Sequence, residues 1–230
     1  GTSTVTNNDG SIASQVRANP SAGFSIISYT GTGANASIGH GLNDEPHLIF
    51  TKNRDASNYG WYTYAKAIGN DKYLVLEDSI AASSFNLWQN TTATSSVFYL
   101  SSNAAVMQNN ADYIAYCFAP VAGYSAMGSY SSGSDPFVFT GFSPRFVLLK
   151  KTNAAGHWYM FDSERGPINP NETWLEANGS GAEQTHANGD IRFLSNGFQP
   201  IGSDIDAGGG SYIYYAVSEN PFQANGGLAR

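Results

Sequence analysis

The pattern of hydrophobic and polar residues predicts many short β-strands. Short apolar runs alternate with clusters of Gly, Asn, Ser and Asp, and long stretches of helical periodicity are absent. In the first half, strands are predicted at residues 24–29, 48–52, 61–64, 73–76, 97–100 and 113–119. In the second half, they are predicted at residues 125–130, 137–140, 146–151, 158–161, 174–176, 191–194 and 212–217. The exception is segment 11–20, where Ile12 and Val16 are four residues apart and Pro20 ends the pattern, which predicts one or two turns of helix.

Some of these strands are apolar at odd and even positions alike. The segment 113–119 reads Tyr-Ile-Ala-Tyr-Cys-Phe-Ala, and residues 212–217 show the same two-faced pattern. A strand that is apolar on both faces is covered on both sides, so both segments are predicted to be central in a sheet. The runs at 48–50 and 146–149, each closed by a lysine, are predicted to be central as well.

The chain also carries similar segments about one hundred residues apart. The offsets between Pro46 and Pro144, Trp61 and Trp158, and Tyr113 and Tyr212 are 98, 97 and 99 residues. A spacing of this size indicates a duplicated module rather than a solenoid repeat. We therefore expect an all-β fold of two homologous antiparallel repeats, sandwich-like or jelly-roll-like, that pack together. The predicted division is a connecting segment at 1–22, repeats at 23–122 and 123–222, and a tail at 223–230.

Composition narrows the class of protein. Charged residues make up only 13% of the 230 residues, and the net charge is −7, so a nucleic-acid partner is not expected. No apolar stretch is long enough to span a bilayer, and we expect neither membrane insertion nor a signal peptide. The single Cys117 lies in an apolar run, which indicates a buried, inert thiol.

Several motifs resemble an uncharacterised family of C-terminal domains from tail-fibre-like proteins of marine and other bacteriophages. The resemblance covers nearly the whole chain from about Ser11 onward. The segments that carry it are residues 22–31, 39–42, 50–54, 113–124, 128–130, 136–142, 193–198 and 219–222. It implies a virion location at the host-facing end of a tail fibre, and it offers no established catalytic residues.

The spacing of histidines and acidic residues bears on metal binding. His40 and His47 are seven residues apart, whereas His157 and His186 stand alone, so a zinc site is not expected and His40 is predicted to tie loop backbone together. For calcium, Asp204 and Asp206, or the loop at 53–58, supply candidate oxygen ligands. The competing interpretation is that such Asx residues bond local backbone groups. We expect no cofactor, and calcium is the one ion kept as an alternative.

Four carboxylates are candidates for catalysis. Glycoside cleavage needs two carboxyl groups facing one another across a cleft, and the candidates are Asp162, Glu164, Glu77 and Asp78. A local ion pair of Asp162 or Glu164 with Arg165 is the preferred interpretation. No catalytic residue is assigned.

The residues around Trp88 are the candidates for ligand binding. Trp61 and Trp158 occupy matching places and are predicted to be core residues, whereas Trp88 lies in an Asn/Ser/Thr-rich stretch without a counterpart. Aromatic faces beside amides suit sugar rings, so the candidate ligand-binding residues are Trp88, Gln89, Asn90 and Tyr130. Packing of Trp88 over the sandwich edge is the alternative.

These observations favour a receptor-binding domain of a phage tail fibre that recognises a host cell-surface receptor, in particular a surface glycan. Such a fibre is expected to be a homotrimer, with affinity gained through multivalency. The alternatives are a polysaccharide depolymerase and a purely structural virion domain.

Overall fold

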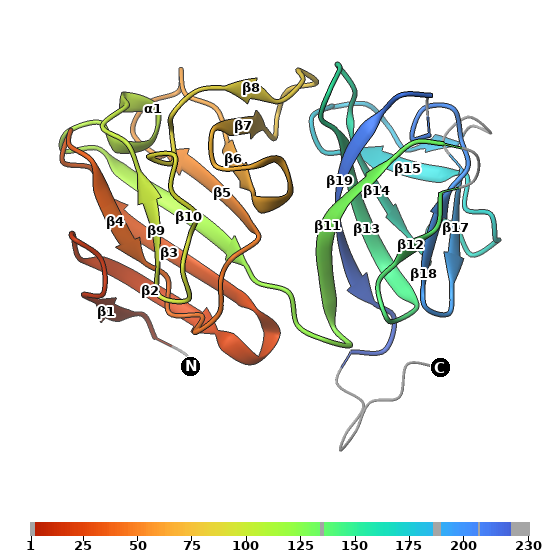
Figure 1. Cartoon of the computed structure of the whole chain (residues 1–230), viewed down its shortest axis with the longest axis horizontal. Helices are drawn as coiled ribbons and strands as arrows, with labels where there is room; N and C mark the ends of the chain where they lie inside the picture. Colours follow the sequence, from red (N-terminus) through yellow and green to blue (C-terminus); the bar gives the residue numbers. More distant parts are fainter. Residues whose placement is uncertain (1–2, 134–135, 186–189, 207, 222–230) are drawn as a thin grey trace. The chain divides into compact units, whose positions relative to one another are not determined.

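The protein is built almost wholly of antiparallel β-strands (Figure 1). The computed structural model describes residues 3–133, 136–185, 190–206 and 208–221, so the predicted tail at 223–230 lies outside the described residues. Contacts divide the chain into two compact units. The first comprises Gly1–Leu76 and Ala82–Pro120, and the second comprises Glu77–Ala81 and Val121–Arg230.

The first unit consists of a large and a small sheet. The large sheet has eight strands in the order β1-β2-β3-β10-β5-β6-β7-β8. Their bounds are Val5–Asn7 (β1), Ser14–Asn19 (β2), Phe24–Thr30 (β3), Asp112–Phe118 (β10), Leu48–Asn53 (β5), Tyr62–Ala65 (β6), Lys72–Val75 (β7) and Ser83–Ser84 (β8). The small sheet pairs β4 (Ala36–Gly39) with β9 (Val97–Leu100). A short helix, α1 (Ala104–Met107), precedes β10.

The second unit also has two main sheets. Its six-stranded sheet has the order β11-β19-β13-β14-β15-β16. The bounds are Ser125–Ser131 (β11), Ser211–Ser218 (β19), Pro144–Lys151 (β13), Trp158–Asp162 (β14), Thr173–Glu176 (β15) and Gln184–Thr185 (β16). The second sheet has the order β12-β18-β17, with β12 at Val138–Phe139, β18 at Gly197–Pro200 and β17 at Ile191–Leu194.

The two units share one strand order. The run β3-β10-β5-β6-β7-β8 of the first unit corresponds, strand by strand in chain order, to β11-β19-β13-β14-β15-β16 of the second. The pair β4–β9 corresponds in the same way to β12–β18. This correspondence lets positions in the two units be matched through their strand registers. Descent of the units from a duplicated module stays a prediction.

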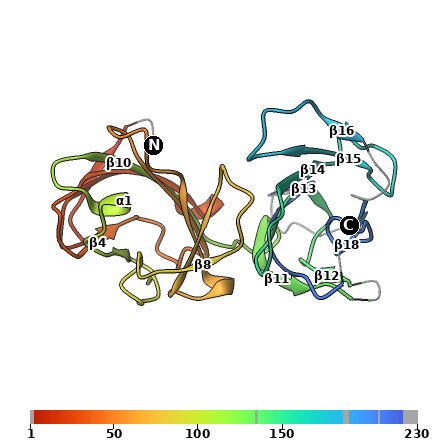
Figure 2. The same cartoon turned by 90° about the horizontal axis from the view of Figure 1, so that it is seen from above.

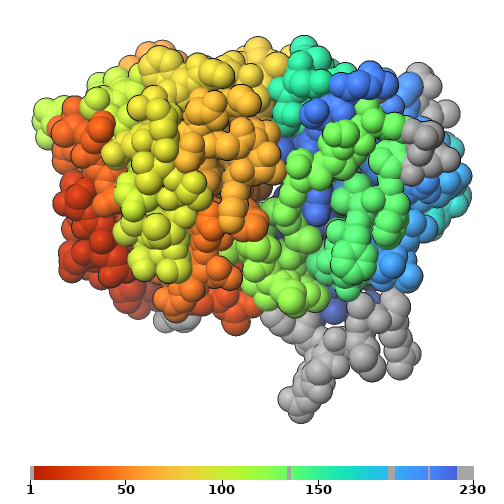
Figure 3. All heavy atoms as spheres, viewed as in Figure 1, coloured from red at the N-terminus to blue at the C-terminus, as the bar shows by residue number. Residues whose placement is uncertain are grey.

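Each unit encloses its own hydrophobic core between its sheets. In the first unit, side chains from β3, β5 and β10 meet Ile38, Phe98 and Leu100 of the small sheet. In the second unit, Val138, Ile191 and Phe198 have the same role. Seen from above, α1 lies between β10 and β4 (Figure 2), and its residues 105–107 are buried. In the space-filling view, side chains close the gaps that the ribbons leave in each unit (Figure 3).

A stacked pair of tyrosines lies at the centre of each core. Tyr29 and Tyr113 are register partners on β3 and β10, with ring centroids 5.0 Å apart and planes 3° from parallel. The register partners Tyr130 and Tyr212 on β11 and β19 stack at 4.9 Å and 6°. In both pairs, the first hydroxyl donates to a backbone carbonyl just before the central strand: Tyr29 to Val106 O at 2.9 Å, and Tyr130 to Ile205 O at 2.8 Å. The stack therefore fixes the loop that leads into the central strand.

A buried lysine anchors part of the second unit. Lys150 is fully buried at the end of β13, and its ammonium donates to the carbonyls of Ser79 at 3.1 Å, Ile80 at 2.8 Å and Gly156 at 2.8 Å. The first two acceptors belong to the short segment Glu77–Ala81 that the first half of the chain contributes to this unit. The matched lysine of the first unit, Lys52, donates to the carbonyl of Tyr59. Burial lowers the pKa of Lys150 to about 8, and the nearby Asp78 carboxylate partly opposes this shift.

The structure confirms the all-β class and the central strands. β10 lies between β3 and β5, and β19 lies between β11 and β13. Cys117 is fully buried on β10, and burial raises the pKa of its thiol. Trp158 is buried, whereas Trp61 is half-buried and stacks on Tyr116 with ring centroids 5.8 Å apart.

The helix predicted at 11–20 was wrong. Residues 14–19 form β2, in which Ser14 and Val16 are buried while Gln15 and Arg17 are exposed. This two-residue alternation fits a strand that covers the edge of β3, and Ile12 forms a bridge with Ile38. Pairing with β3 therefore outweighs the four-residue spacing of Ile12 and Val16, because a segment this short has little helical stability of its own.

Replacing Tyr29 or Tyr130 by phenylalanine is predicted to destabilise the unit that contains it. Each substitution keeps the ring stack and removes one buried hydrogen bond, which costs about 1–2 kcal/mol because the carbonyl loses its donor. Native-state hydrogen exchange measures each unit separately. The control is Tyr99→Phe on β9, because the Tyr99 side chain makes no hydrogen bond among the described residues. Equal exchange in Tyr29→Phe and Tyr99→Phe would contradict the role of the buried hydroxyl.

Lys150 is predicted to make stability depend on alkaline pH. Its native pKa of about 8 is below the ordinary value of 10.5, so between these values the unfolded lysine holds a proton that the native one has lost. The unfolded state binds more protons in this window, so the free energy of unfolding gains from Lys150 as pH rises. Urea denaturation of wild type and Lys150→Met at several pH values isolates this effect, since the contributions of the other titratable groups cancel in the difference between the two proteins. The free energy of unfolding of the wild type, relative to that of Lys150→Met, should rise between pH 8 and 10.5. A free-energy difference that stays constant with pH would disprove the lowered pKa of Lys150.

Candidate functional site

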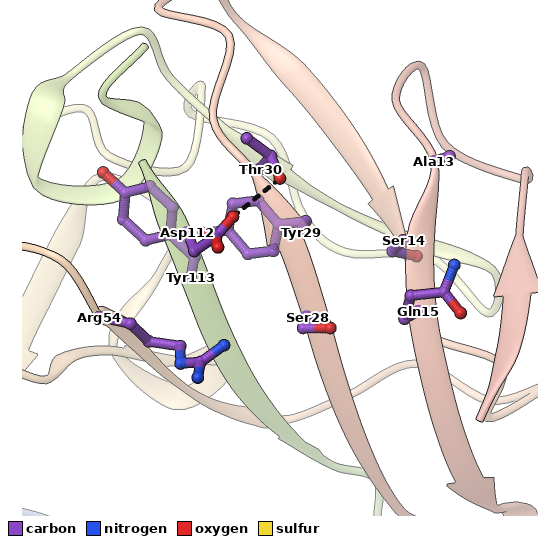
Figure 4. Close-up of a pocket in the computed structure, with 9 residues that line it drawn as sticks. All are labelled: Ala13, Ser14, Gln15, Ser28, Tyr29, Thr30, Arg54, Asp112 and Tyr113. Carbon is purple, nitrogen blue, oxygen red and sulfur yellow. Dashed lines mark hydrogen bonds between the residues drawn. The ribbon is translucent and has the colours of Figure 1, made fainter. Parts of the chain in front are cut away.

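A polar groove on the large sheet of the first unit is the best candidate site (Figure 4). It has a volume of about 240 Å³. Its lining comes from four adjacent strands and their ends: Ala13, Ser14, Gln15, Ser28, Tyr29, Thr30, Arg54, Asp112 and Tyr113. The volume is below the roughly 300–1,000 Å³ of pockets for drug-sized ligands, so it suits a small polar group such as one sugar residue.

The alternation of side chains along β3 and β10 produces this groove. Tyr29 and Tyr113 point into the core, and their neighbours Ser28, Thr30 and Asp112 therefore point to the other face. Thr30 and Asp112 are register partners, so their side chains lie side by side. Arg54 directly follows β5, and its backbone N–H donates to the carbonyl of Asp112 at 2.8 Å, which holds the arginine beside β10.

The hydrogen bonds of the groove leave donors and acceptors available to a ligand. Thr30 Oγ1 donates to Asp112 Oδ1 at 2.9 Å, and the backbone N–H of Asp112 donates to Asp55 Oδ2 at 2.7 Å. In the part of the chain that the structure describes, Asp112 Oδ2 accepts no hydrogen bond, and the Arg54 guanidinium makes no hydrogen bond or ion pair. Figure 4 shows the guanidinium extending across the sheet towards Ser28. Arg54 and Asp112 thus offer free N–H donors and a free carboxylate oxygen.

The tyrosines beneath the groove do not offer ring faces to a ligand. Tyr29 is 4% exposed, and Tyr113 is fully buried. Burial raises the pKa of both phenols, and the nearby Tyr113 and Cys117 add to the shift of Tyr29. Hydrogen bonds from Gln108 and Asn53 partly oppose the rise in the pKa of Tyr113. The Tyr113 hydroxyl donates to Ala104 O at 2.7 Å and accepts from Gln108 N at 2.8 Å. Both rings are therefore structural, and recognition in the groove relies on polar side chains.

A second pocket lies in the other unit and has a volume of about 390 Å³. It is lined by Ser79, Lys151, Ala155, Gly156, His157, Tyr159, Ser203 and Asp204. His157 Nδ1 lies 3.1 Å from Glu176 Oε2 and 3.0 Å from Asn178 Nδ2. Burial raises the pKa of Tyr159 to about 12, with Asp204 and Glu176 adding to the shift. The charges here are already paired or mixed in sign, so this pocket is the weaker candidate.

The structure gives Trp88, Gln89 and Tyr130 structural roles. Trp88 is 2% exposed, and its indole N–H donates to Lys72 O at 2.8 Å, so it belongs to the core and presents no face to a sugar. The Gln89 amide bonds the carbonyls of Ala36 and Leu100, at 2.9 and 2.8 Å. Asn90 is exposed. Tyr130 is buried in the second unit, and burial raises the pKa of its phenol.

The candidate metal ligands are not gathered into a site. Asp204 lines the second pocket, whereas Asp206 Oδ1 accepts a hydrogen bond from Gly133 N at 3.1 Å. Across the described residues, no group of three or more His, Cys, Asp or Glu side chains is arranged to hold a metal ion.

Residues 53–58 and the histidines also have local roles. Asn53 Oδ1 accepts from the backbone N–H groups of Asp55 and Ala56, as expected of an Asx turn. His40 is buried, and Nδ1 accepts from Leu42 N at 3.2 Å while Nε2 lies 3.1 Å from Thr94 O, so it ties loop backbone together as predicted. Burial lowers the pKa of His40. The fourth histidine, His186, lies outside the described residues.

Two of the four candidate catalytic carboxylates are held by arginines. Asp162 pairs with Arg165 at 2.6 Å, and Glu164 pairs with Arg145 at 2.9 Å. Partial burial alone would raise the pKa of Asp162, but hydrogen bonds from Arg165 outweigh it and hold the pKa below the usual value. A general acid for glycoside cleavage needs a raised pKa, so Asp162 is unsuited to that role. Asp78 accepts from the backbone N–H of Ile80 at 3.2 Å, and Glu77 lies in the same short segment.

Sequence reasoning missed Arg54, Asp112 and Gln15 as site residues. The usable signal was the polar positions that alternate with core residues at the ends of predicted strands, such as Ser28 and Thr30 around Tyr29. That signal marks an exposed face but does not show which strands are neighbours.

No described helix is long and apolar enough to cross a bilayer.

Comparisons with known proteins give the family of the chain. No curated protein matches the sequence, and no solved structure matches it either. The sequence profile of one family matches residues 1–221. The chain therefore belongs to the family described as a domain of unknown function, DUF7483.

Proposed function

We propose that the protein is a non-catalytic, carbohydrate-binding module for attachment to a host-cell surface. The observation that carries the proposal is the polar groove of the first unit, where the Arg54 guanidinium and Asp112 Oδ2 are available to a ligand. Sugars present hydroxyl groups that both donate and accept, so they match a site that offers both kinds of partner.

The carboxylates support binding rather than catalysis. Asp162 and Glu164 are each engaged by an arginine, and hydrogen bonds from Arg165 hold the pKa of Asp162 low. The groove itself contains one carboxylate, Asp112, whereas the usual glycosidase mechanism needs two. A depolymerase is therefore the less favoured function.

The biological setting is part of the proposal and comes from the sequence resemblance. We place the module on a virion, at the host-facing end of a phage tail fibre, with a homotrimeric fibre as its carrier. A groove that takes one sugar residue would bind weakly by itself. Several copies on trimeric fibres would raise the avidity by orders of magnitude, about 10²–10⁴, without any new contact.

Glycan binding is predicted to depend on the groove. An oligomerised form of the chain is expected to bind a subset of bacterial surface glycans on an array, and its Arg54→Ala and Asp112→Ala variants to bind about tenfold or more weakly. That factor follows from the loss of one hydrogen bond to a charged group. The matched control is Arg192→Ala, which removes an exposed arginine from β17 of the second unit.

The outcomes separate binding from the other functions. Urea denaturation of each variant checks that a loss of binding does not come from unfolding. Absence of binding by the oligomerised wild type to every bacterial glycan and to host cells would disprove the proposed function. Release of new reducing ends from a host polysaccharide would show a depolymerase instead.

A further inference from the structure

The groove of the first unit carries two charged residues, Arg54 and Asp112, and the matched positions of the second unit carry uncharged residues. The register pair Thr30–Asp112 of the first unit corresponds to Ser131–Ser211 of the second. The backbone contact from Arg54 N to Asp112 O, 2.8 Å long, corresponds to Thr152 N to Ser211 O at 2.7 Å. The backbone is thus the same at both places, whereas arginine and aspartate are replaced by threonine and serine.

These two charges are not needed to hold the fold together. The second unit keeps the same backbone bond with Thr152 and Ser211, and Thr152 Oγ1 bonds Ser211 O at 3.0 Å. The guanidinium of Arg54 makes no hydrogen bond or ion pair within the described residues, and Arg54 is exposed to solvent. A charged pair that the fold does not require, at the edge of a groove, points to a ligand.

The arrangement of the pair selects the kind of group that binds. Asp112 Oδ1 is already occupied by the Thr30 hydroxyl, so Oδ2 is the free acceptor. Arg54 offers only donors. A ligand that satisfies both must donate from one atom and accept at another nearby atom. Two hydroxyls on neighbouring carbons of a sugar ring satisfy this requirement, since each can donate or accept.

The local charge selects against acidic sugars. The carboxylates of Asp112 and Asp55 are close together, because Asp55 Oδ2 accepts from the backbone N–H of Asp112 at 2.7 Å. Two carboxylates and one guanidinium are thus carried by residues that meet through the backbone of Asp112, and the whole chain has a net charge of −7. A ligand carboxylate would gain one partner in Arg54 and be repelled by two like charges.

We infer that the groove is specific for a neutral sugar residue, with one of two vicinal hydroxyls donating to Asp112 and the other accepting from Arg54. This inference rests on the proposed function and adds the class of ligand and the role of each residue. Asp55 acts through Asp112 and is a positioning residue. Acidic sugars, such as uronic acids, are excluded by charge.

The test compares neutral and acidic sugars of the same shape. Methyl glycosides of glucose, galactose and mannose, their uronic acid counterparts and their 3-deoxy analogues are titrated against the full chain, with backbone amide chemical shifts as the readout. At least one neutral glycoside is expected to shift amides of β3, β10 and residues 54–55. Its uronic acid counterpart and an analogue lacking one vicinal hydroxyl are expected to bind at least about fivefold more weakly.

Asp112→Asn tests the electrostatic part of the inference. The amide oxygen keeps an acceptor while the negative charge is lost, so the neutral sugar should lose little affinity and the uronic acid should gain. The preference of the wild type for the neutral sugar over the uronic acid should also shrink when salt is raised from about 0.05 to 0.5 M, because exposed charges are then screened. Arg192→Ala serves again as the control and should leave the preference unchanged.

Each outcome counts for or against the inference. A uronic acid that binds as well as its neutral counterpart, or an unchanged preference in Asp112→Asn, would overturn the inference and leave glycan binding intact. Neutral-sugar binding that shifts no amides of the groove would overturn it as well. If neither the glycosides nor the array glycans bind, both the inference and the proposed function fail.

Discussion

The stacked tyrosine pair is the interaction on which each unit depends. Tyr29 and Tyr113 join two central strands by ring contact, and the Tyr29 hydroxyl also holds the backbone of α1 through Val106. Tyr130 and Tyr212 repeat the arrangement in the second unit. Because the hydroxyl is buried, its bond to the carbonyl is needed to avoid an unsatisfied polar group, so only one position of the loop is compatible with the stack.

The same constraint positions the candidate site. Asp112 precedes Tyr113 on β10, and Thr30 follows Tyr29 on β3, so fixing the two rings fixes the two polar neighbours on the opposite face. The pleat of a strand alternates the direction of successive side chains. One buried pair therefore determines the core on one side of the sheet and the groove on the other.

The two units show how such a scaffold takes on different surface chemistry. Arg54 and Asp112 of the first unit correspond to Thr152 and Ser211 at the matched positions of the second. Outward-facing positions lie outside the core, so their substitution changes the surface without the packing cost of a core substitution. The matching positions inside the core keep tyrosine in both units.

The sequence by itself determined the all-β class, the central strands and the burial of Cys117, because these follow from local patterns: two-faced apolar runs and frequent turn residues. It did not determine β2, whose strand form comes from pairing with β3, nor the burial of Trp88, which depends on contacts from distant strands. Only the tertiary structure brought Arg54 beside Asp112, since residues far apart in sequence become neighbours through strand order. Strand order is set by the packing of whole sheets, and no local pattern of side chains encodes it.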